Sequence, residues 1–537
     1  MKKIIISLIA LFCSVCNIDA QIKLDEKPHS FSFKTQIKTV SDLPIFLMET
    51  FDIEAYKLSV KNNKALRFAK AFDVNIDIKN AGLKEELDNG TIWRLAVKSV
   101  KAYTLNLIFS QYRLEKGSRL HLYNPARTEV LGAFSEINNP SNPENNTNTS
   151  FAVQPVEGDE IIVELFEPLE NSGSVCIIGK VNHDFIGYSG GTFGRSCTDQ
   201  VDVICSEGDN WRKEINSACF LIINGVDACS AALINNTDED GKPLVLTANH
   251  CYDYDPPQTL EQISNSAANT IIVFNYDSPW CNGSNGIHTN TVSGAALRAN
   301  SRNTDFLLLE ANNIIPTSFY PYHSGWSRAG VQPPTGVGIH HPSIDVKKIS
   351  THSQTPNNSN CMQFQLPSKI FVLNTDFWGL TSWDVTPNGH SMTEYGSSGS
   401  PLYNSNKRII GQLFGPGRLA VCPLITCTIT GGQSSLQTSN FSNYGKIAVS
   451  WDGNGTSASR LKDWLNPLLL PAPTDFLGLR FIRFYTVNHN AWFTGDVVKF
   501  LDVNILTGFD VVVTDMQDKF EATGFLNIPA GATLQIF

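Results

Sequence analysis

Three short segments in the middle of the 537-residue chain contain the residue types of a nucleophilic catalytic centre. An apolar run over 244–248 ends just before His250, Asp305 opens a second apolar run, and Ser398 lies in the small-residue segment 396–401. A serine hydroxyl becomes a good nucleophile when an imidazole takes its proton, and a buried carboxylate holds that imidazole in the required tautomer. The pattern therefore predicts His250 as general base, Asp305 as its orienting acid and Ser398 as nucleophile.

Each piece also has a structural interpretation. A histidine after a strand, an aspartate capping a strand and a flexible Gly-Ser turn are all common without catalysis. The conjunction is more specific, because the chain order His, Asp, Ser excludes the α/β-hydrolase arrangement, in which the serine comes first. Glycines beside Ser398 would let backbone N–H groups face a developing oxyanion.

The elements that would position these residues are short strands. Side chains alternate between apolar and polar over 93–109, and 120–123 and 161–165 also read as strands, so residues 21–190 predict a β-sandwich. The Gly-rich stretch 189–195 predicts a linker. Residues 191–471 form the segment with the catalytic pattern, and 472–537 are again strand-like. This last region would serve secretion, surface attachment or binding of carbohydrate or protein.

Composition and the start of the chain predict an exported protein. Residues 1–20 read as a signal peptide, with two lysines, an apolar stretch and Ala20 before the expected cut. Hydrophobic residues are 42% of the chain and no later segment is long and apolar enough to cross a membrane. A net charge of −10 argues against nucleic-acid binding. We therefore expect a secreted, soluble monomer.

Ten of the twelve cysteines remain after the signal peptide is removed. In an oxidising compartment these predict structural disulfides. None of the ten shows the short paired spacing of a zinc site, so neither a metal nor another cofactor is expected. The pair His340-His341 is interpreted as a strand end near the active site and not as a metal ligand set.

Six motifs along 197–470 resemble secreted bacterial trypsin-fold serine proteases of the lysyl endopeptidase type. The motifs are Leu246-Thr-Ala-Asn-His-Cys251, Thr304-Asp-Phe-Leu-Leu-Leu-Glu310, Gly338-Ile-His-His-Pro342, Thr393-Glu-Tyr-Gly-Ser-Ser-Gly-Ser-Pro401, Gly411-Gln-Leu413 and Ser459-Arg-Leu-Lys-Asp-Trp-Leu465. The resemblance implies an all-β fold, a trypsin-like double β-barrel with the site between barrels, and a short C-terminal helix capped by Ser459. It implies His250, Asp305 and Ser398 as the triad, with the oxyanion held by the N–H groups of Gly396 and Ser398.

The same resemblance implies disulfide pairs. Cys229 would pair with Cys251 and Cys205 with Cys281, whereas Cys197 would pair with either Cys422 or Cys427. It names no partner for Cys176, Cys219 and Cys361.

The family pattern fails at the S1 pocket, which binds the residue before the scissile bond (P1). Lysine preference in the family rests on a carboxylate whose matching position here is Ser442, and the other trypsin-like acid position is Met392. No Asp or Glu occurs between Ser398 and Asp452. Phe414, beside Gly415, replaces a family histidine. A buried ammonium without a partner is costly, so we expect a neutral or apolar P1 residue. A lysine- or arginine-specific enzyme that uses another acid is the alternative.

Residues 21–190 resemble the propeptides of such proteases through the segments Trp93-Arg-Leu95, Leu120-His-Leu-Tyr123 and Val181-Asn-His183. This resemblance implies a folding helper and an intramolecular inhibitor. Ser397 stands where most trypsin-like enzymes have the aspartate that binds a newly freed N-terminus. Activation is therefore expected to come from removal of the first domain, and a protease specific for basic residues would cut at Arg195. The substrate would be a protein or peptide. Rival hypotheses are a non-catalytic adhesin or binding protein on a protease scaffold, and an esterase.

Overall fold

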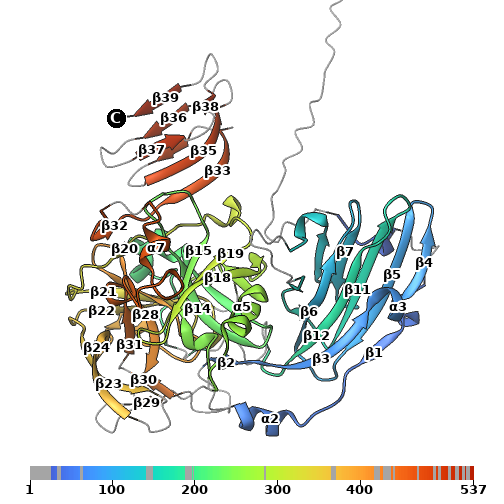
Figure 1. The fold of residues 1–537 in the computed structure, drawn as a ribbon, viewed down its shortest axis with the longest axis horizontal. Coiled ribbons are helices and arrows are strands. Elements are labelled where there is room, and N and C mark those ends of the chain that lie inside the picture. Colours follow the sequence, from blue (N-terminus) through green and yellow to red (C-terminus); the bar gives the residue numbers. More distant parts are fainter. Residues whose placement is uncertain are drawn as a thin grey trace, which may run out of the picture.

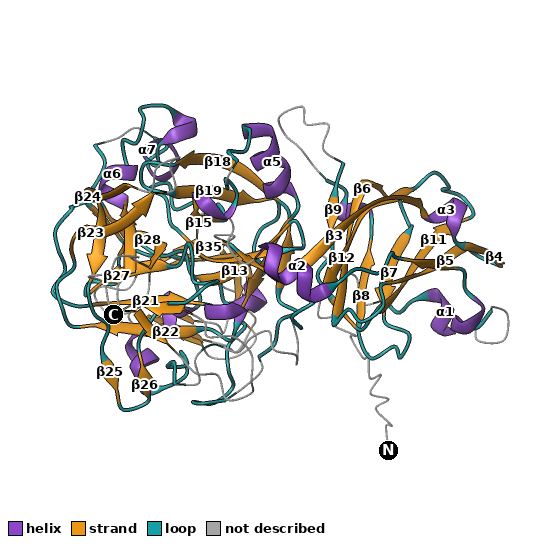
Figure 2. Ribbon diagram, turned by 90° about the horizontal axis from the view of Figure 1, so that it is seen from below, coloured by secondary structure: helices purple, strands orange, loops and turns teal. Residues whose placement is uncertain are grey.

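The computed structural model consists of β-rich parts arranged along the chain, and the part formed by residues 26–187 lies beside the part that follows it in both views (Figures 1 and 2). The signal-peptide segment lies outside the described residues. The described residues are 26–187 without 33–37, 61–64 and 141–148; 196; 199–487 without 255, 284–285, 365–369, 417–423, 427–436, 440–441 and 469–470; and the strand segments 491–493, 497–505, 510–513, 519–522, 526–527 and 533–536.

Two sheets face each other in residues 26–187, which we call the first domain. Alternate residues of its strands, such as Leu105, Leu107 and Phe109, are fully buried in one common core, as the alternation predicts. One sheet contains β1 (Ile45–Leu47), β4 (Leu83–Leu87), β5 (Gly90–Lys98), β7 (Arg119–Tyr123), β8 (Val130–Phe134) and β11 (Glu160–Pro168). The other contains β3 (Ala69–Asp77), β6 (Thr104–Arg113), β9 (Phe151–Ala152), β10 (Val156–Glu157) and β12 (Val175–Asp184).

The next sheet forms what we call the first lobe of the protease segment, which is the segment predicted from residues 191–471 to be a protease. It contains β13 (Ala218–Ile223), β14 (Asp227–Leu233), β15 (Leu244–Ala248), β16 (Thr270–Phe274), β17 (Thr291–Ser293), β18 (Ala295–Ser301) and β19 (Phe306–Ala311), and β2 (Leu66–Arg67) of the first domain pairs with it. β15 and β19 are buried on both faces. Val245 and Leu307 pack inside the lobe, whereas Leu246 and Leu308 pack toward the second lobe, which explains their continuous apolar runs.

A nine-stranded sheet forms the second lobe. It contains β20 (Trp326–Ser327), β21 (Gly336–His340), β22 (Lys348–His352), β23 (Asn357–Phe364), β24 (Ile370–Leu380), β27 (Pro401–Asn404), β28 (Ile409–Pro416), β31 (Ser442–Lys446) and β32 (Asp475–Phe476). One apolar cluster joins Leu246 and Phe306 of the first lobe to Val337, Ile339 and Tyr403 of the second. The two lobes therefore share a core.

The remaining elements are short. The helices are α1 (His29–Ser32), α2 (Ile53–Val60), α3 (Ile78–Ala81), α4 (Arg212–Ile215), α5 (Leu260–Ala268), α6 (Ile447–Ser450) and α7 (Lys462–Leu465). Two hairpins are β25 (Val385–Thr386) with β26 (Gly389–His390), and β29 (Leu424–Thr426) with β30 (Gln437–Ser439). The last strands are β33 (Arg480–Val487), β34 (Ala491–Phe493), β35 (Val497–Ile505), β36 (Asp510–Val513), β37 (Lys519–Ala522), β38 (Leu526–Asn527) and β39 (Thr533–Ile536).

The C-terminal helix corrects one expectation. Ser459 does not cap α7, because the N-cap of that helix is Leu461, which makes no capping hydrogen bond through its side chain. Ser459 instead ends a 3-10 turn, where it bonds with Thr456. Among the described helices, none combines the length and the hydropathy that crossing a membrane requires.

Candidate active site

The strand register brings Asp305 to His250. β15 and β19 are antiparallel, and the last pair of their register joins Ala248 to Phe306. The residues just beyond that pair, Asn249 and Asp305, therefore lie opposite each other, and the Asn249 N–H donates to the Asp305 carbonyl at 2.7 Å. Asp305 has a positive φ of 58°, an uncommon backbone conformation for a non-glycine residue. In this backbone conformation the Asp305 carboxylate points toward His250.

Both carboxylate oxygens of Asp305 bind His250. Oδ1 accepts the backbone N–H of His250 at 2.9 Å, and Oδ2 lies 2.7 Å from its Nδ1. Because a carboxylate only accepts hydrogen bonds, Nδ1 must carry a proton, and a neutral imidazole then has a free lone pair on Nε2. The two residues are only 4% and 3% exposed. Their arrangement is that of an imidazole held ready to accept a proton at Nε2.

Two further contacts fix the position of the imidazole. The Cys229–Cys251 disulfide ties the residue after His250 to β14. The ring of Phe414 stands edge-on to the His250 ring, with centroids 5.7 Å apart. The histidine is thus held by one covalent link and by one aromatic neighbour from the second lobe.

Ser398 lies in a turn, residues 396–400, which we call the serine turn and which is clamped to the first lobe. Ser230 of β14 donates its N–H to the Ser398 carbonyl at 2.8 Å and its hydroxyl to the Gly396 carbonyl at 2.9 Å. Gly399 has φ +84°, and a Cβ there would lie 2.2 Å from Thr247 Oγ1 and 2.4 Å from the Ser230 carbonyl. Only glycine fits so close an approach. The clamp holds Ser398 against β14, the strand whose Cys229 is linked by a disulfide to Cys251, the residue after His250.

A buried chain of neutral groups supports the serine turn. Ser350 donates to the Met392 carbonyl at 2.8 Å, so His340 Nε2 donates to Ser350 at 3.0 Å and His340 Nδ1 accepts from Ser397 at 2.8 Å. Ser397 Oγ also accepts the Glu394 N–H at 3.2 Å. Burial lowers the pKa of His340 to about 3, so its imidazole is neutral. This chain fixes residues 392–397 without any charge.

Of the four S1 candidates, Phe414 and Gly415 lie in β28 and Ser442 lies in β31. Met392 precedes the serine turn. Ser442 is fully buried, accepts the indole N–H of Trp383 at 3.0 Å and lies 2.7 Å from the Thr393 hydroxyl. Met392 is buried, whereas Phe414 is half-buried. A Cβ added to Gly415 would meet no atom within 4 Å. The nearby Glu394 is bound by Gln200 at 2.5 Å and Ser343 at 3.1 Å.

The structure contains both disulfides that the resemblance implied without ambiguity, Cys229–Cys251 and Cys205–Cys281. Cys197, Cys422 and Cys427 lie outside the described residues, as does the side chain of Cys361. Cys176 and Cys219 are free thiols, and burial raises both pKa values, that of Cys219 to about 12. Such thiols are unreactive packing groups.

Sequence reasoning missed two groups that hold the site, Ser230 and the His340 chain. His340 is a strand end near the serine turn, as expected, but its two hydrogen bonds were not foreseen. The sequence signal that could have found them is the run of small hydroxyl residues at 397, 398 and 400, which need hydrogen-bond partners when they are buried. Within the described residues, no three His, Cys, Asp or Glu side chains are grouped to hold a metal ion.

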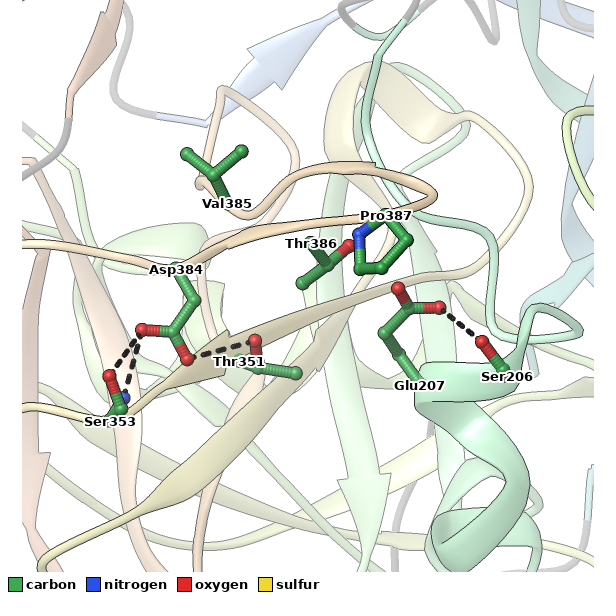
Figure 3. Close-up of a pocket in the computed structure, with 8 residues that line it drawn as sticks. All are labelled: Ser206, Glu207, Thr351, Ser353, Asp384, Val385, Thr386 and Pro387. Carbon is green, nitrogen blue, oxygen red and sulfur yellow. Dashed lines mark hydrogen bonds between the residues drawn. The ribbon is translucent and has the colours of Figure 1, made fainter.

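A separate hollow of about 520 Å³ lies on the second lobe (Figure 3). Its wall includes Asp384, whose carboxylate accepts from Ser353 at 2.7 Å and Thr351 at 3.1 Å, and Glu207, which accepts from Asn388 at 2.8 Å. None of the triad or S1 candidates lines it. The acids of this hollow are bound to neighbouring side chains and take no part in the site described above.

Comparison with known proteins finds a family model that matches part of the chain. Residues 193–423 match the family model described as lysyl endopeptidase, C-terminal domain. Solved proteases are also similar. A Glu endopeptidase in complex with MPD is 14% identical over 46% of this chain and 91% of its own, with a TM-score of 0.27. The active form of the Rv3671c protease from M. tuberculosis is 12% identical over 47% and 87%, also with a TM-score of 0.27.

The middle of the chain is all-β, with two lobes that share a core. Residues 193–423 are similar to the C-terminal domain of lysyl endopeptidases, a family of trypsin-like serine proteases, which confirms the resemblance predicted from the sequence. The family match covers less than half of the 537 residues. The domain boundaries given above stay predictions.

Proposed function

We propose that the chain is the precursor of a secreted serine endopeptidase that cleaves peptide bonds through an acyl-enzyme on Ser398. The observation that carries the proposal is the double hydrogen bond from His250 to Asp305, which puts the proton of a neutral imidazole on Nδ1 and its lone pair on Nε2. The serine turn is clamped to β14 of the same lobe. The family match supports the same reaction class.

In this mechanism His250 removes the proton of the Ser398 hydroxyl as the oxygen attacks the scissile carbonyl. Asp305 stabilises the imidazolium that forms. The N–H groups of Gly396 and Ser398 donate to the oxyanion, and Gly396 has the positive φ of +89° that such a turn needs. His250 then gives its proton to the leaving amine, and water hydrolyses the ester by the same steps.

We propose a neutral or apolar P1 residue. The position at which the family has its carboxylate is Ser442, whose hydroxyl is already bonded to Trp383 and Thr393. Glu394, the nearby acid, is engaged by Gln200 and Ser343. Initial rates on peptides that differ only at P1 test this, and a strong preference for lysine or arginine would overturn it.

Labelling with a fluorophosphonate tests the reaction class. The mature wild-type protein, from which the first domain has been removed, should be labelled and should digest casein, whereas Ser398→Ala should do neither. Ser405→Ala is the matched control, because Ser405 is an exposed serine of the same lobe. Equal labelling of Ser398→Ala, or no labelling of the wild type, would favour the non-catalytic binding protein. Labelling without casein digestion would favour an esterase.

The role of the first domain as folding helper and inhibitor remains a proposal. N-terminal sequencing of the protein recovered from culture medium would show whether residues 21–190 are removed, and whether the cut follows Arg195.

A further inference from the structure

The first domain adds a strand to the first lobe. β2 pairs with the start of β14, where Leu66 lies opposite Ala228 and Arg67 opposite Asp227. Next to this pairing, the Phe68 N–H donates to the Val226 carbonyl at 2.9 Å. Strand addition joins two surfaces through main-chain hydrogen bonds and is a common mode of protein recognition. The first domain is therefore joined to the first lobe by main-chain hydrogen bonds and not by side-chain packing alone.

A bidentate ion pair crosses the same boundary. Arg67 Nε lies 2.5 Å from Asp227 Oδ1, and Nη2 lies 2.7 Å from Oδ2. Asp227 is only 5% exposed, and burial raises the pKa of its carboxyl while the Arg67 guanidinium opposes that rise. Loss of the Arg67 side chain while the first domain stays in place would leave a buried carboxylate without this partner, which is strongly unfavourable.

Apolar side chains from both sides form one core cluster. β13 faces the interior of the lobe with Cys219 and Leu221, and faces the first domain with Phe220 and Ile222. The cluster contains Phe68, Ala69, Ile108 and Ala152 of the first domain and Phe220, Ile222, Val226, Ala228, Ile271, Val273, Tyr276, Ile344 and Val346 of the protease segment. Departure of the first domain would expose part of this apolar surface to water.

Hydrogen bonds at the rim complete the contact. The Thr291 hydroxyl donates to the Gln154 side chain at 2.9 Å, and the Ser293 hydroxyl donates to the Ala152 carbonyl at 2.6 Å. Among the described residues, no hydrogen bond or ion pair joins the first domain to His250, Asp305 or Ser398. The contacts that hold the first domain therefore involve other residues than the proposed triad.

From these contacts we propose that, once the chain is cut between the two domains, the first domain stays bound as a noncovalent subunit on the outer face of the first lobe. The released protein is then a two-chain complex, held by β2, the Arg67–Asp227 pair and the shared apolar cluster. The proposal rests on the interface and is independent of the proposed enzymatic function.

The test uses the full chain in a Ser398→Ala background, so that self-digestion cannot interfere. Residues 189–195 are replaced by the recognition sequence of a site-specific protease, and the purified protein is cut to completion. Size-exclusion chromatography at low micromolar concentration should give both fragments in one peak at the volume of the uncut chain. Two separate peaks, each at the volume of one fragment, would overturn the proposal.

Two variants assign the contact. Arg67→Ala should weaken the complex by at least about tenfold in Kd, because it leaves the buried Asp227 unpaired. Arg113→Ala is the control, since Arg113 is an exposed cation of the first domain whose ion pair with Glu115 stays within that domain. If Arg67→Ala does not fold, Thr291→Val removes a rim hydrogen bond without altering the first domain and should also weaken the complex. Affinities equal to that of the unmodified protein in the folded variants would contradict the proposed contacts.

Discussion

The two sides of the candidate active site are held in different ways. The His250 side contains a carboxylate–imidazole pair that is buried and hydrogen-bonded at two atoms. The serine turn is supported by a chain of hydrogen bonds between neutral groups, from Ser397 of the turn through His340 of β21 to Ser350 of β22. Charge is present where a proton must move, and hydrogen bonds alone are present where a backbone turn must stay in place.

The largest effect is expected on the charged side. Asp305→Asn keeps the shape of the side chain but offers an amide N–H or a neutral oxygen to His250, so the tautomer with a free Nε2 is no longer enforced. We expect kcat to fall about 10⁴-fold, as in other triads of this type. Steady-state kinetics on a casein-derived peptide measures this. A loss of less than about tenfold would mean that Asp305 does not orient the general base.

Importing a charge into the neutral S1 region gives a second test. In Ser442→Asp, the new carboxylate would accept from Trp383 Nε1 and the Thr393 hydroxyl, which already surround this position. We expect the ratio of kcat/KM for lysine over leucine at P1 to rise about 10- to 100-fold, because the carboxylate offers a buried ammonium its partner. Ser442→Asn is the uncharged control. An unchanged ratio would show that residue 442 does not face the P1 side chain.

A smaller effect is expected from the neutral chain. Ser397→Ala removes the hydrogen bonds to His340 Nδ1 and from the Glu394 N–H. Displacement of the oxyanion N–H groups should lower kcat about tenfold with little change in KM, since those groups act in the transition state. On the other side of the Ser397–His340 hydrogen bond, His340→Gln keeps hydrogen-bonding atoms and should retain more activity than His340→Leu. Equal rates for all three variants and the wild type would remove this chain from the mechanism.

The smallest effect concerns stability and pH. Burial holds the pKa of folded His340 at about 3, compared with the ordinary value of 6.5, so below about pH 6.5 the unfolded chain binds a proton that the folded chain does not. The free energy of unfolding should therefore fall as the pH drops from about 6.5 toward about 3. Urea unfolding of Ser398→Ala with and without His340→Gln should show a shallower fall without the histidine. Parallel curves would contradict this.

The sequence predicted the charged side of the site better than the neutral side. Two continuous apolar runs located β15 and β19, and the register of these neighbouring strands brings His250 and Asp305 together. The chain through His340 depends on contacts between residues 10 to 57 positions apart, and short hydroxyl side chains leave no periodic pattern. The helix near 459–466 was predicted in place, but its cap was wrong because Ser459 bonds locally with Thr456.

The contact between the first domain and the first lobe was also beyond sequence reasoning. Phe220 and Ile222 read as ordinary residues of a buried strand, and nothing in their spacing says that a different domain covers them. Arg67 and Asp227 are separated by 160 positions. An ion pair between residues so far apart in the sequence forms only when the sheets of the two domains dock.

The hydrogen atom that Gly399 has in place of a side chain determines how near the two lobes can come. A methyl group there would collide with Thr247 and Ser230 of the first lobe. Any larger residue at this position would push the serine turn away from β14 and β15, the strands against which it is clamped. The spacing between the two lobes is therefore set by a single glycine, whatever residues line the S1 region.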